Sequence, residues 1–189
     1  MIQNPFRSNI LLTKAFYFAR YHHGSQKRKG GAPYLTHLVS VAQILNQASY
    51  PKSVIAAGLL HDVLEDTGCE REDLECEMGK EVCSIVLQVT DKDKTAPWAE
   101  RKANYIRGLK RATKPALAVA CANKIDNLLC LEKGFRQDGK RFMAGFSGGA
   151  KEKMENYTAI YRMIRSRYAA CPLLPAYENA LKTFKKADA

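Results

Sequence analysis

Apolar residues recur at helical spacing over most of the chain, and this pattern predicts helices separated by short polar breaks. In the first helix, residues 9–23, apolar side chains fall three or four positions apart, and Ser8 is placed to cap its start. Thr36 is placed to cap the second helix in the same way. Prolines at helix starts and glycines at breaks mark the other boundaries. The predicted helices cover residues 9–23, 36–45, 51–66, 70–78, 81–89, 97–111, 116–131, 151–168 and 172–184.

Alternation of apolar and polar residues, the pattern typical of half-buried strands, is absent. Residues 24–33, 90–97 and 134–149 are rich in glycine or in basic side chains, and we expect irregular loops there. No repeat, low-complexity tract or linker divides the chain. The sequence therefore predicts an all-α fold in which residues 1–189 form a single domain.

The stretch 59–67 carries the densest set of chemically active side chains. Four of them lie at positions i, i+1, i+4 and i+5: His61, Asp62, Glu65 and Asp66. On one helix they would share an arc of roughly 140°. Residues 53–60 are almost wholly apolar, so this helix is expected to enter the interior, where charge is costly unless it is paired or bound to a metal. A solvated helix end is the simpler interpretation of a His-Asp pair, but the apolar lead-in and the second acid pair favour a metal site.

The charge of the chain suggests the kind of partner. With 189 residues the chain can form one domain with its own core, and its formal net charge is +11. No acid precedes Asp62, and acids then crowd into residues 62–77. A basic surplus suits a polyanionic partner, either nucleic acid or a heavily phosphorylated small molecule. Because basic and aromatic residues are not interleaved along one face, we favour the small molecule over nucleic acid.

The apolar runs and the cysteines indicate in which cellular compartment the protein is expected. The longest apolar runs, residues 54–60 and 116–122, are far shorter than the ~20 residues needed to span a bilayer, and the start of the chain lacks the arrangement of a secretory signal. We therefore expect no membrane partner. The six cysteines include no C-x-x-C pair, and we expect reduced thiols in a cytoplasmic protein. The oligomeric state does not follow from the sequence.

Two longer motifs together resemble a known family. The first, H-x-x-Q-x-R-x-x-G-x-P-Y-x-x-H, spans residues 23–37, and the second, H-D-x-x-E-D, spans residues 61–66. Shorter matches follow at residues 89–91, 100–102 and 122–128. In order and spacing the set resembles the HD-domain hydrolases of RelA/SpoT type, and above all the stand-alone small alarmone hydrolases. The resemblance covers about residues 10–168 and implies a helical bundle with one bound divalent ion, usually manganese.

The resemblance assigns the metal ligands to His37, His61, Asp62 and a fourth position, which is Asn123 here. In the family the fourth position is an aspartate, in the pattern Ala-Asp-Lys-x-x-Asn. An Asn carbonyl can ligate a hard ion but brings no negative charge, so we expect weaker binding of the ion, or three strong ligands plus water. Asp126 is an alternative ligand, although it lies about 60° from Asn123 around a helix; we favour the motif register. Mixed imidazole and carboxylate ligation suits Mn²⁺.

The same resemblance makes Glu65 and Asp66 the catalytic pair. Hydrolysis of a phosphate ester requires a water to lose a proton while the phosphate charge is neutralised, and a carboxylate beside that water can accept the proton. A polar helix end is the alternative interpretation, and it applies more to Asp66 than to Glu65.

Further matched positions concern the substrate. Arg28 would lie against the purine ring, a planar guanidinium on a planar base, with Lys29 and Lys27 as neighbouring alternatives. Tyr34 is expected to pack beside His37, and Tyr157 either lines the nucleotide pocket or belongs to the core. The remaining matches are to positions that contact phosphate, sugar or ribose: Lys102, Lys153 and Asn127.

The resemblance implies a metal-dependent 3′-pyrophosphohydrolase of alarmone nucleotides. The substrate would be (p)ppGpp or its adenosine analogue (p)ppApp, and the products GDP/GTP or ADP/ATP plus pyrophosphate. Two alternatives stay open. One is an HD-type phosphohydrolase acting on another nucleotide, and the other is a catalytically degenerate HD domain that only binds a nucleotide, which Asn123 keeps in consideration.

Overall fold

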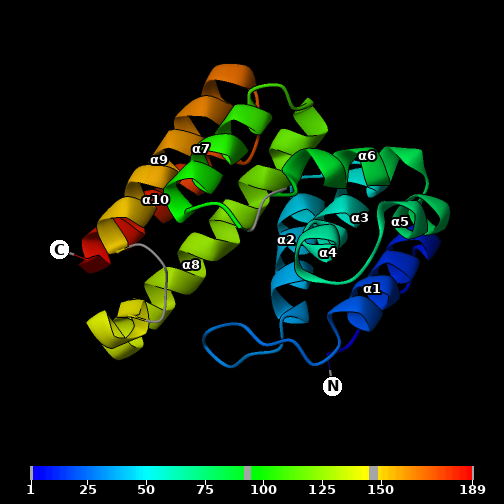
Figure 1. Cartoon of the computed structure of the whole chain (residues 1–189), viewed down its shortest axis with the longest axis horizontal. Coiled ribbons are helices and arrows are strands. Elements are labelled where there is room, and N and C mark those ends of the chain that lie inside the picture. The colour runs from blue at the N-terminus through cyan, green and yellow to red at the C-terminus, as the bar shows by residue number, and fades with distance from the viewer. Residues whose placement is uncertain (1, 92–94, 145–148, 189) are drawn as a thin grey trace.

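The computed structural model describes residues 2–91, 95–144 and 149–188. This part of the chain is helical, and one isolated antiparallel bridge, Lys27 with Pro33, is its only β pairing (Figure 1). The predicted all-α fold is confirmed. The helices in chain order are α1 (Ile10–His23), α2 (Leu35–Gln47), α3 (Lys52–Leu60), α4 (Val63–Asp66), α5 (Arg71–Met78), α6 (Lys80–Val89), α7 (Trp98–Leu109), α8 (Lys114–Ala144), α9 (Ala150–Arg167) and α10 (Leu174–Asp188).

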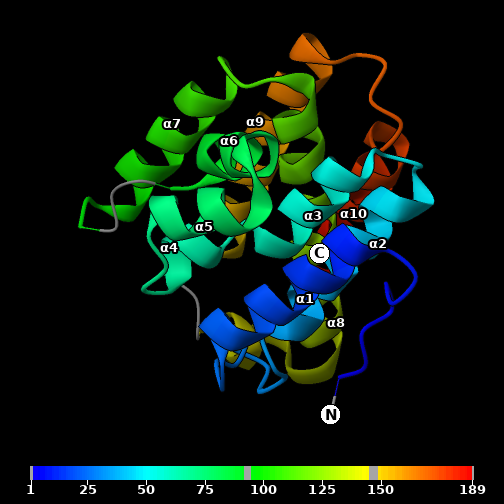
Figure 2. The same cartoon turned by 90° about the vertical axis from the view of Figure 1, so that its right-hand side faces the viewer.

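Helix α3 lies at the centre of the N-terminal half, where α1, α2, α6 and α8 pack around it (Figures 1 and 2). Every residue from Val54 to Leu60 is buried. Because this run has no polar side chain, it can be enclosed on all sides without leaving a polar side chain unsatisfied. The apolar lead-in of the sequence is therefore an interior helix, and the polar residues that follow it start from inside the molecule.

Helix α8 supplies the second apolar run. Residues 116–122 are buried, and α8 packs against α2, α3 and α6 on one side and against α9 and α10 on the other. In Figure 1 it crosses the molecule between these two groups. The apolar run of α8 ends in buried polar residues, Asn123 and Asp126, just as that of α3 ends in His61 and Asp62. Two separate parts of the chain thus bring polar groups into the interior.

Helices α2 and α3 approach each other closely at Gly58. A Cβ atom at this position would lie 2.5 Å from Leu45 Cδ1 and 3.5 Å from Val41 Cγ1. The close approach brings His37, in the first turn of α2, next to His61, which follows α3. The centroids of the two imidazole rings are 5.1 Å apart.

The polar stretch 59–67 does not form one continuous helix, contrary to the prediction. Helix α3 ends at Leu60, and His61 and Asp62 form a turn before the short helix α4. The turn lets the His61 ring bond back to α3, with Nδ1 2.8 Å from the carbonyl oxygen of Gly58. The acid pair of α4 therefore follows the His-Asp pair across a turn.

Two predicted helix caps are also wrong. Asn9 rather than Ser8 caps α1, where its side chain accepts a hydrogen bond from the backbone N–H of Leu12. Thr36 lies inside α2, and its hydroxyl donates to the carbonyl of Pro33 at 2.7 Å. Ser, Thr and Asn share the capping role, so apolar spacing does not choose between neighbouring candidates.

The segment 134–149 is more regular than predicted. Helix α8 continues to Ala144 and departs from helical geometry at Gly139, where φ is 55°. Residues 145–148 of this segment, like residues 92–94 of the predicted loop 90–97, lie outside the described residues.

Within the described ranges, no helix is both long and apolar enough to cross a membrane. All six cysteines are free.

Substituting Gly58 by valine is expected to destabilise the protein, because the added methyl groups would overlap Leu45 in the closely packed contact between α2 and α3. Overpacking of this kind costs about 1–3 kcal/mol, or several degrees in Tm. Gly108→Val is the matched control, since Gly108 lies in α7 and a Cβ atom added there would meet no atom within 4 Å. Thermal unfolding measures both variants, and equal Tm values would contradict a tight contact at Gly58.

Candidate functional site

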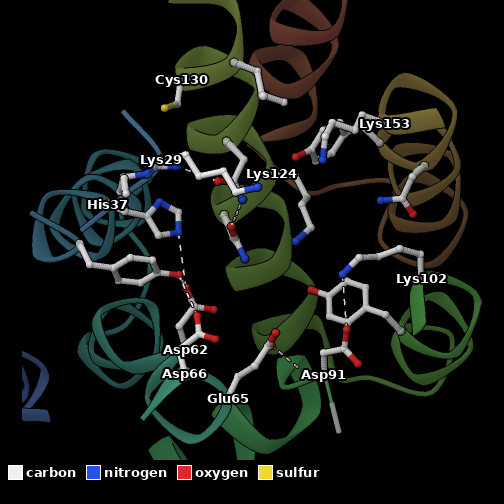
Figure 3. A pocket seen from close by; sticks show the side chains of 18 of the residues that line it. Lys29, His37, Asp62, Glu65, Asp66, Asp91, Lys102, Lys124, Cys130 and Lys153 are labelled. Atoms are coloured by element: carbon white, nitrogen blue, oxygen red, sulfur yellow. Dashed lines mark hydrogen bonds and ion pairs between the residues drawn. The ribbon is translucent and has the colours of Figure 1, made fainter. Parts of the chain in front are cut away.

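A cavity of about 500 Å³ opens where α2, α4, α7, α8 and α9 meet the basic loop 24–33. Every predicted site residue except His61 lines it, and His61 lies fully buried beside Asp62. In Figure 3 the labelled basic side chains occupy the upper and right-hand parts of the cavity, and the carboxylates its lower part. The bases are Lys29, Lys124, Lys153 and Lys102. The acids are Asp62, Asp66, Glu65 and Asp91.

His37 presents one ring nitrogen to this cavity, because Asp126 occupies the other. The Nδ1 atom lies 2.5 Å from Asp126 Oδ2, and Nε2 lies 3.6 Å from Asp62 Oδ2. Burial lowers the pKa of His37, which favours the neutral ring. With Nδ1–H donated to Asp126, the lone pair of Nε2 is directed toward Asp62.

His61 shows the same arrangement. Its Nδ1 is held by the carbonyl of Gly58, and its Nε2 lies 3.1 Å from Asp62 Oδ2. This contact is within ion-pair distance, but the buried Nε2 atom has no hydrogen-bond partner among the residues that the structure describes. A buried nitrogen without a partner is costly unless something else binds it.

Asp62 is held between the two imidazole rings. Burial by itself raises the pKa of a carboxyl group, but the His61 and His37 rings and the hydroxyl of Tyr34 together lower the pKa of Asp62 well below its usual range. The Tyr34 oxygen is 2.6 Å from Asp62 Oδ2 and 3.1 Å from Asp66 Oδ2. The sequence suggested only that Tyr34 packs beside His37. In the structure its hydroxyl also contacts both Asp62 and Asp66, and so it links the two acids.

His37, His61 and Asp62 fit a divalent metal ion. Their ligand atoms all lie within 4.8 Å of one another. Two imidazoles and one carboxylate are a donor set for a first-row divalent ion. Each histidine is fixed through Nδ1 by an oxygen acceptor, which is how ligating histidines are usually oriented. The partnerless Nε2 of His61 agrees with this interpretation.

The fourth predicted ligand, Asn123, is buried at the same cavity wall. Its Oδ1 accepts a hydrogen bond from Asn127 Nδ2 at 2.6 Å. The alternative ligand, Asp126, is turned toward His37 Nδ1 and Arg28, so it supports one of the ligands from behind. Although burial raises the pKa of a carboxyl group, these partners lower the pKa of Asp126 to about 2. Ligation by Asn123 stays a prediction.

The acid pair on α4 differs in its surroundings. Glu65 Oε2 accepts the backbone N–H of Asp91 at 3.1 Å, and Glu65 Oε1 lies 3.7 Å from the Arg101 guanidinium. Burial, together with the negative charge of Asp62, raises the pKa of Glu65. A carboxylate with a raised pKa is a better proton acceptor, which suits a general base. Asp66 lies on the other side, next to Tyr34.

The predicted substrate-binding residues surround the rest of the cavity. The Arg28 guanidinium donates to Asp126 Oδ2 at 2.8 Å and to Asn127 Oδ1 at 2.9 Å, so α8 holds it in place. The ammonium group of Lys102 is 3.4 Å from Asp91 Oδ2. The Nζ atom of Lys153, on α9, lies 5.9 Å from the centroid of the Trp98 ring. The other two predicted residues at the cavity wall are Lys29 and Tyr157.

Sequence reasoning did not assign a role to Lys124, which also lines the cavity. Burial, assisted by nearby Lys102, lowers the pKa of Lys124 to about 8. The available signal was its isolation among the bases, since no other Lys or Arg occurs between residues 115 and 132. Asp126 was considered only as a ligand, because its contact with His37 joins residues 89 positions apart.

Known proteins share both the sequence and the fold. A match to the HD domain family covers residues 15–144. The Drosophila melanogaster guanosine-3′,5′-bis(diphosphate) 3′-pyrophosphohydrolase MESH1 is 37% identical over 119 residues, which is 61% of this chain and 66% of that protein. An Aquifex aeolicus guanosine-3′,5′-bis(diphosphate) 3′-pyrophosphohydrolase is 34% identical over 152 residues, which is 79% of this chain and 21% of that protein.

The solved structure of a metazoan ortholog of SpoT that hydrolyses ppGpp is similar over 96% of this chain and 98% of its own. The TM-score is 0.77 and the sequence identity 26%. An all-helical fold with a His-His-Asp cluster at the end of its buried helix defines an HD-type domain. The chain belongs to the HD domain family, and its relatives there are hydrolases of RelA/SpoT type. Hydrolases of this family are metal-dependent, in agreement with the donor set.

Replacing Asp62 by asparagine is expected to weaken Mn²⁺ binding by at least about 100-fold, because it removes the only carboxylate of the cluster and even loss of a supporting residue costs about 10–100-fold. Glu65→Gln is the matched control: it removes a carboxylate from the same cavity but outside the cluster, so affinity should change only a few-fold. Calorimetric titration with Mn²⁺ measures both. Equal losses in the two variants would contradict the separation of Glu65 from the ligand set.

Proposed function

We propose that the chain is a metal-dependent 3′-pyrophosphohydrolase of alarmone nucleotides, with (p)ppGpp or (p)ppApp as substrate. The observation that carries this proposal is the division of one cavity into a metal-ligating, acidic part and a basic part. The acidic part is suited to cleaving a phosphate ester, and the basic part to holding a small molecule with several phosphates. The names of the relatives support the same activity.

The ion would be held by His37, His61 and Asp62, with Asn123 as a fourth, neutral oxygen ligand. We propose Mn²⁺, because it accepts both imidazole and oxygen ligands. When bound, the ion supplies a positive charge that polarises the phosphoryl group and lowers the pKa of a bound water. Since Asn123 stands where the family has an aspartate, the site carries one negative charge fewer and should bind the ion more weakly.

Glu65 is proposed as the general base. Its raised pKa makes it a stronger proton acceptor, and the backbone N–H of Asp91 fixes the orientation of its carboxylate. As the water oxygen bonds to the 3′ phosphorus, its proton passes to Glu65. The bond between phosphorus and the ribose 3′-oxygen breaks, pyrophosphate leaves, and the 3′-oxygen takes up a proton. Asp66 and Asp62 both contact the hydroxyl of Tyr34, and this shared contact holds the two carboxylates in position.

The substrate would lie across the cavity with its base beside Arg28 or Lys29. The guanidinium of Arg28 is already held by Asp126 and Asn127, so little side-chain freedom is lost when a purine stacks on it. Lys102 and Lys153 lie on the opposite wall, where they would meet phosphates. Asn127 would contact the ribose, and Tyr157 would line the nucleotide pocket.

A second candidate is a nucleotide-binding HD domain without turnover. The specific observation in its favour is the Asn123 amide, whose oxygen is engaged by Asn127. A third, an HD-type phosphohydrolase for another nucleotide, uses the same metal cluster and is distinguished only by its substrate.

Pyrophosphate release from ppGpp and from ppApp with added Mn²⁺ tests the proposed function. The chain is expected to hydrolyse at least one of them, and Glu65→Gln to lose about 10²–10⁴-fold in rate. The Asn123→Asp variant should reach full activity at lower Mn²⁺ concentration, because it restores a charge at the metal. No release by either chain would contradict the proposal. Release by Asn123→Asp alone would favour the nucleotide-binding candidate.

Arg28→Ala is expected to raise KM for the hydrolysed nucleotide about tenfold with a smaller effect on kcat, since stacking on a base is worth about 1–3 kcal/mol. Arg167→Ala, at the exposed end of α9, is the control and should leave both constants unchanged. Steady-state kinetics measures the two. An unchanged KM in Arg28→Ala would show that the base binds elsewhere in the cavity.

A further inference from the structure

Lys124 is a cation in the cavity that has no ion pair among the described residues. It lies on α8, one position after Asn123, and its side chain is partly buried. It contacts an aromatic ring, because the ammonium group is 4.9 Å from the ring centroid of Tyr105. In Figure 3 it stands in the middle of the cavity, between Lys29 and Lys153.

Two other cations of the cavity are compensated by acids. Lys102 lies 3.4 Å from Asp91 Oδ2, and Arg28 is paired with Asp126 at 2.8 Å. A partly buried ammonium without a carboxylate partner is costly to the folded state, since burial removes water that would solvate it. An arrangement of this kind is expected where a ligand supplies the missing negative charge.

Tyr105 adds a second unsatisfied group at the same place. It is 9% exposed and lines the cavity, and its buried hydroxyl oxygen has no hydrogen-bond partner within the described ranges. Burial, and then the carboxylates of Glu65, Asp62 and Asp91, raise the pKa of Tyr105, so its hydroxyl stays protonated. An ammonium and an uncommitted hydroxyl donor thus adjoin the metal cluster.

An anion would supply both a negative charge for the Lys124 ammonium and an acceptor for the Tyr105 hydroxyl. The position of Lys124 indicates which anionic group of the substrate this is. The chain places Lys124 next to Asn123, and Lys124 lines the same cavity as Asp62 and Glu65. The phosphorus that reacts must lie beside these same residues. The base-binding side, at Arg28, is held by Asp126 and Asn127, which lie two and three positions further along α8.

We propose that Lys124 is a substrate-contacting residue whose ammonium group binds the 3′-pyrophosphoryl group of the nucleotide, with the Tyr105 ring as its support and the Tyr105 hydroxyl as a second donor. This inference rests on the proposed function and adds to it a residue that holds the group being released. Its positive charge offsets the negative charge on the phosphoryl oxygens of the group under attack.

Lys124→Met tests the inference, because methionine keeps an unbranched apolar stem and removes the charge. The kcat/KM for ppGpp is expected to fall about 10–100-fold, the loss typical of a hydrogen bond to a charged group. The Tm should stay the same or rise, because the variant removes a partly buried cation that has no ion pair among the described residues. Tyr105→Phe, which keeps the ring, should lower kcat/KM by a smaller factor, about 3–10-fold.

Lys114→Met is the matched control. Lys114 lies on the same helix and also sits over an aromatic ring, that of Tyr168 at 5.6 Å, but it does not line the cavity. Its substitution should leave the kinetics at the level of the unmodified chain.

Calorimetric titration with inorganic pyrophosphate, in EDTA and without added metal, separates this inference from the proposed function. The unmodified chain should bind pyrophosphate at least several-fold more tightly than Lys124→Met. If the unmodified chain does not hydrolyse ppGpp, the proposed function fails, and this difference in affinity still decides the role of Lys124. Equal pyrophosphate affinity would overturn the inference, and so would a Tm several degrees lower in Lys124→Met, which would show a structural role.

Discussion

The site depends on keeping the carboxylate of Asp62 ionised inside the protein. Asp62 follows an apolar helix that is buried on all sides, and it is surrounded by the rings of His61 and His37 and by the hydroxyl of Tyr34. Removing a carboxylate from water is expensive unless such partners compensate it. Each histidine is fixed through its other nitrogen, so both direct Nε2 toward the acid. A cation bound between the two Nε2 atoms and the Asp62 carboxylate would compensate the same charge.

The site depends, second, on the positions at which the two apolar helix segments end. The buried runs of α3 and α8 each give way to polar residues at the cavity, so α3 leads to the metal cluster and α8 leads to Asn123, Lys124 and Asp126. The charge of Asp126 is engaged in orienting His37 and holding Arg28. The cluster of His37, His61 and Asp62 therefore has a single carboxylate.

Much of the fold could be predicted from the sequence because helical periodicity reports which face of each segment is buried. The choice between neighbouring cap residues could not be predicted in this way, because Ser8 was expected to cap α1 and Asn9 caps it. The site residues came from motif resemblance, and the cavity brings all but the fully buried His61 to its wall. The role of Asp126 and the hydrogen bond of Tyr34 to Asp62 were missed, because they join positions 89 and 28 residues apart and leave no periodic signal. Lys124 was missed for a different reason: a lone lysine in a helix usually faces solvent.

The most direct measurement is anomalous X-ray diffraction at the manganese edge from crystals grown with Mn²⁺. The account predicts one strong peak in the cavity, within coordination distance of His37 Nε2, His61 Nε2 and an Asp62 carboxylate oxygen. Asp126 should remain bonded to His37 Nδ1, outside the coordination sphere. A peak coordinated by Asp126 or Glu65, or the absence of any peak at this cluster, would contradict the assignment on which the proposed chemistry rests.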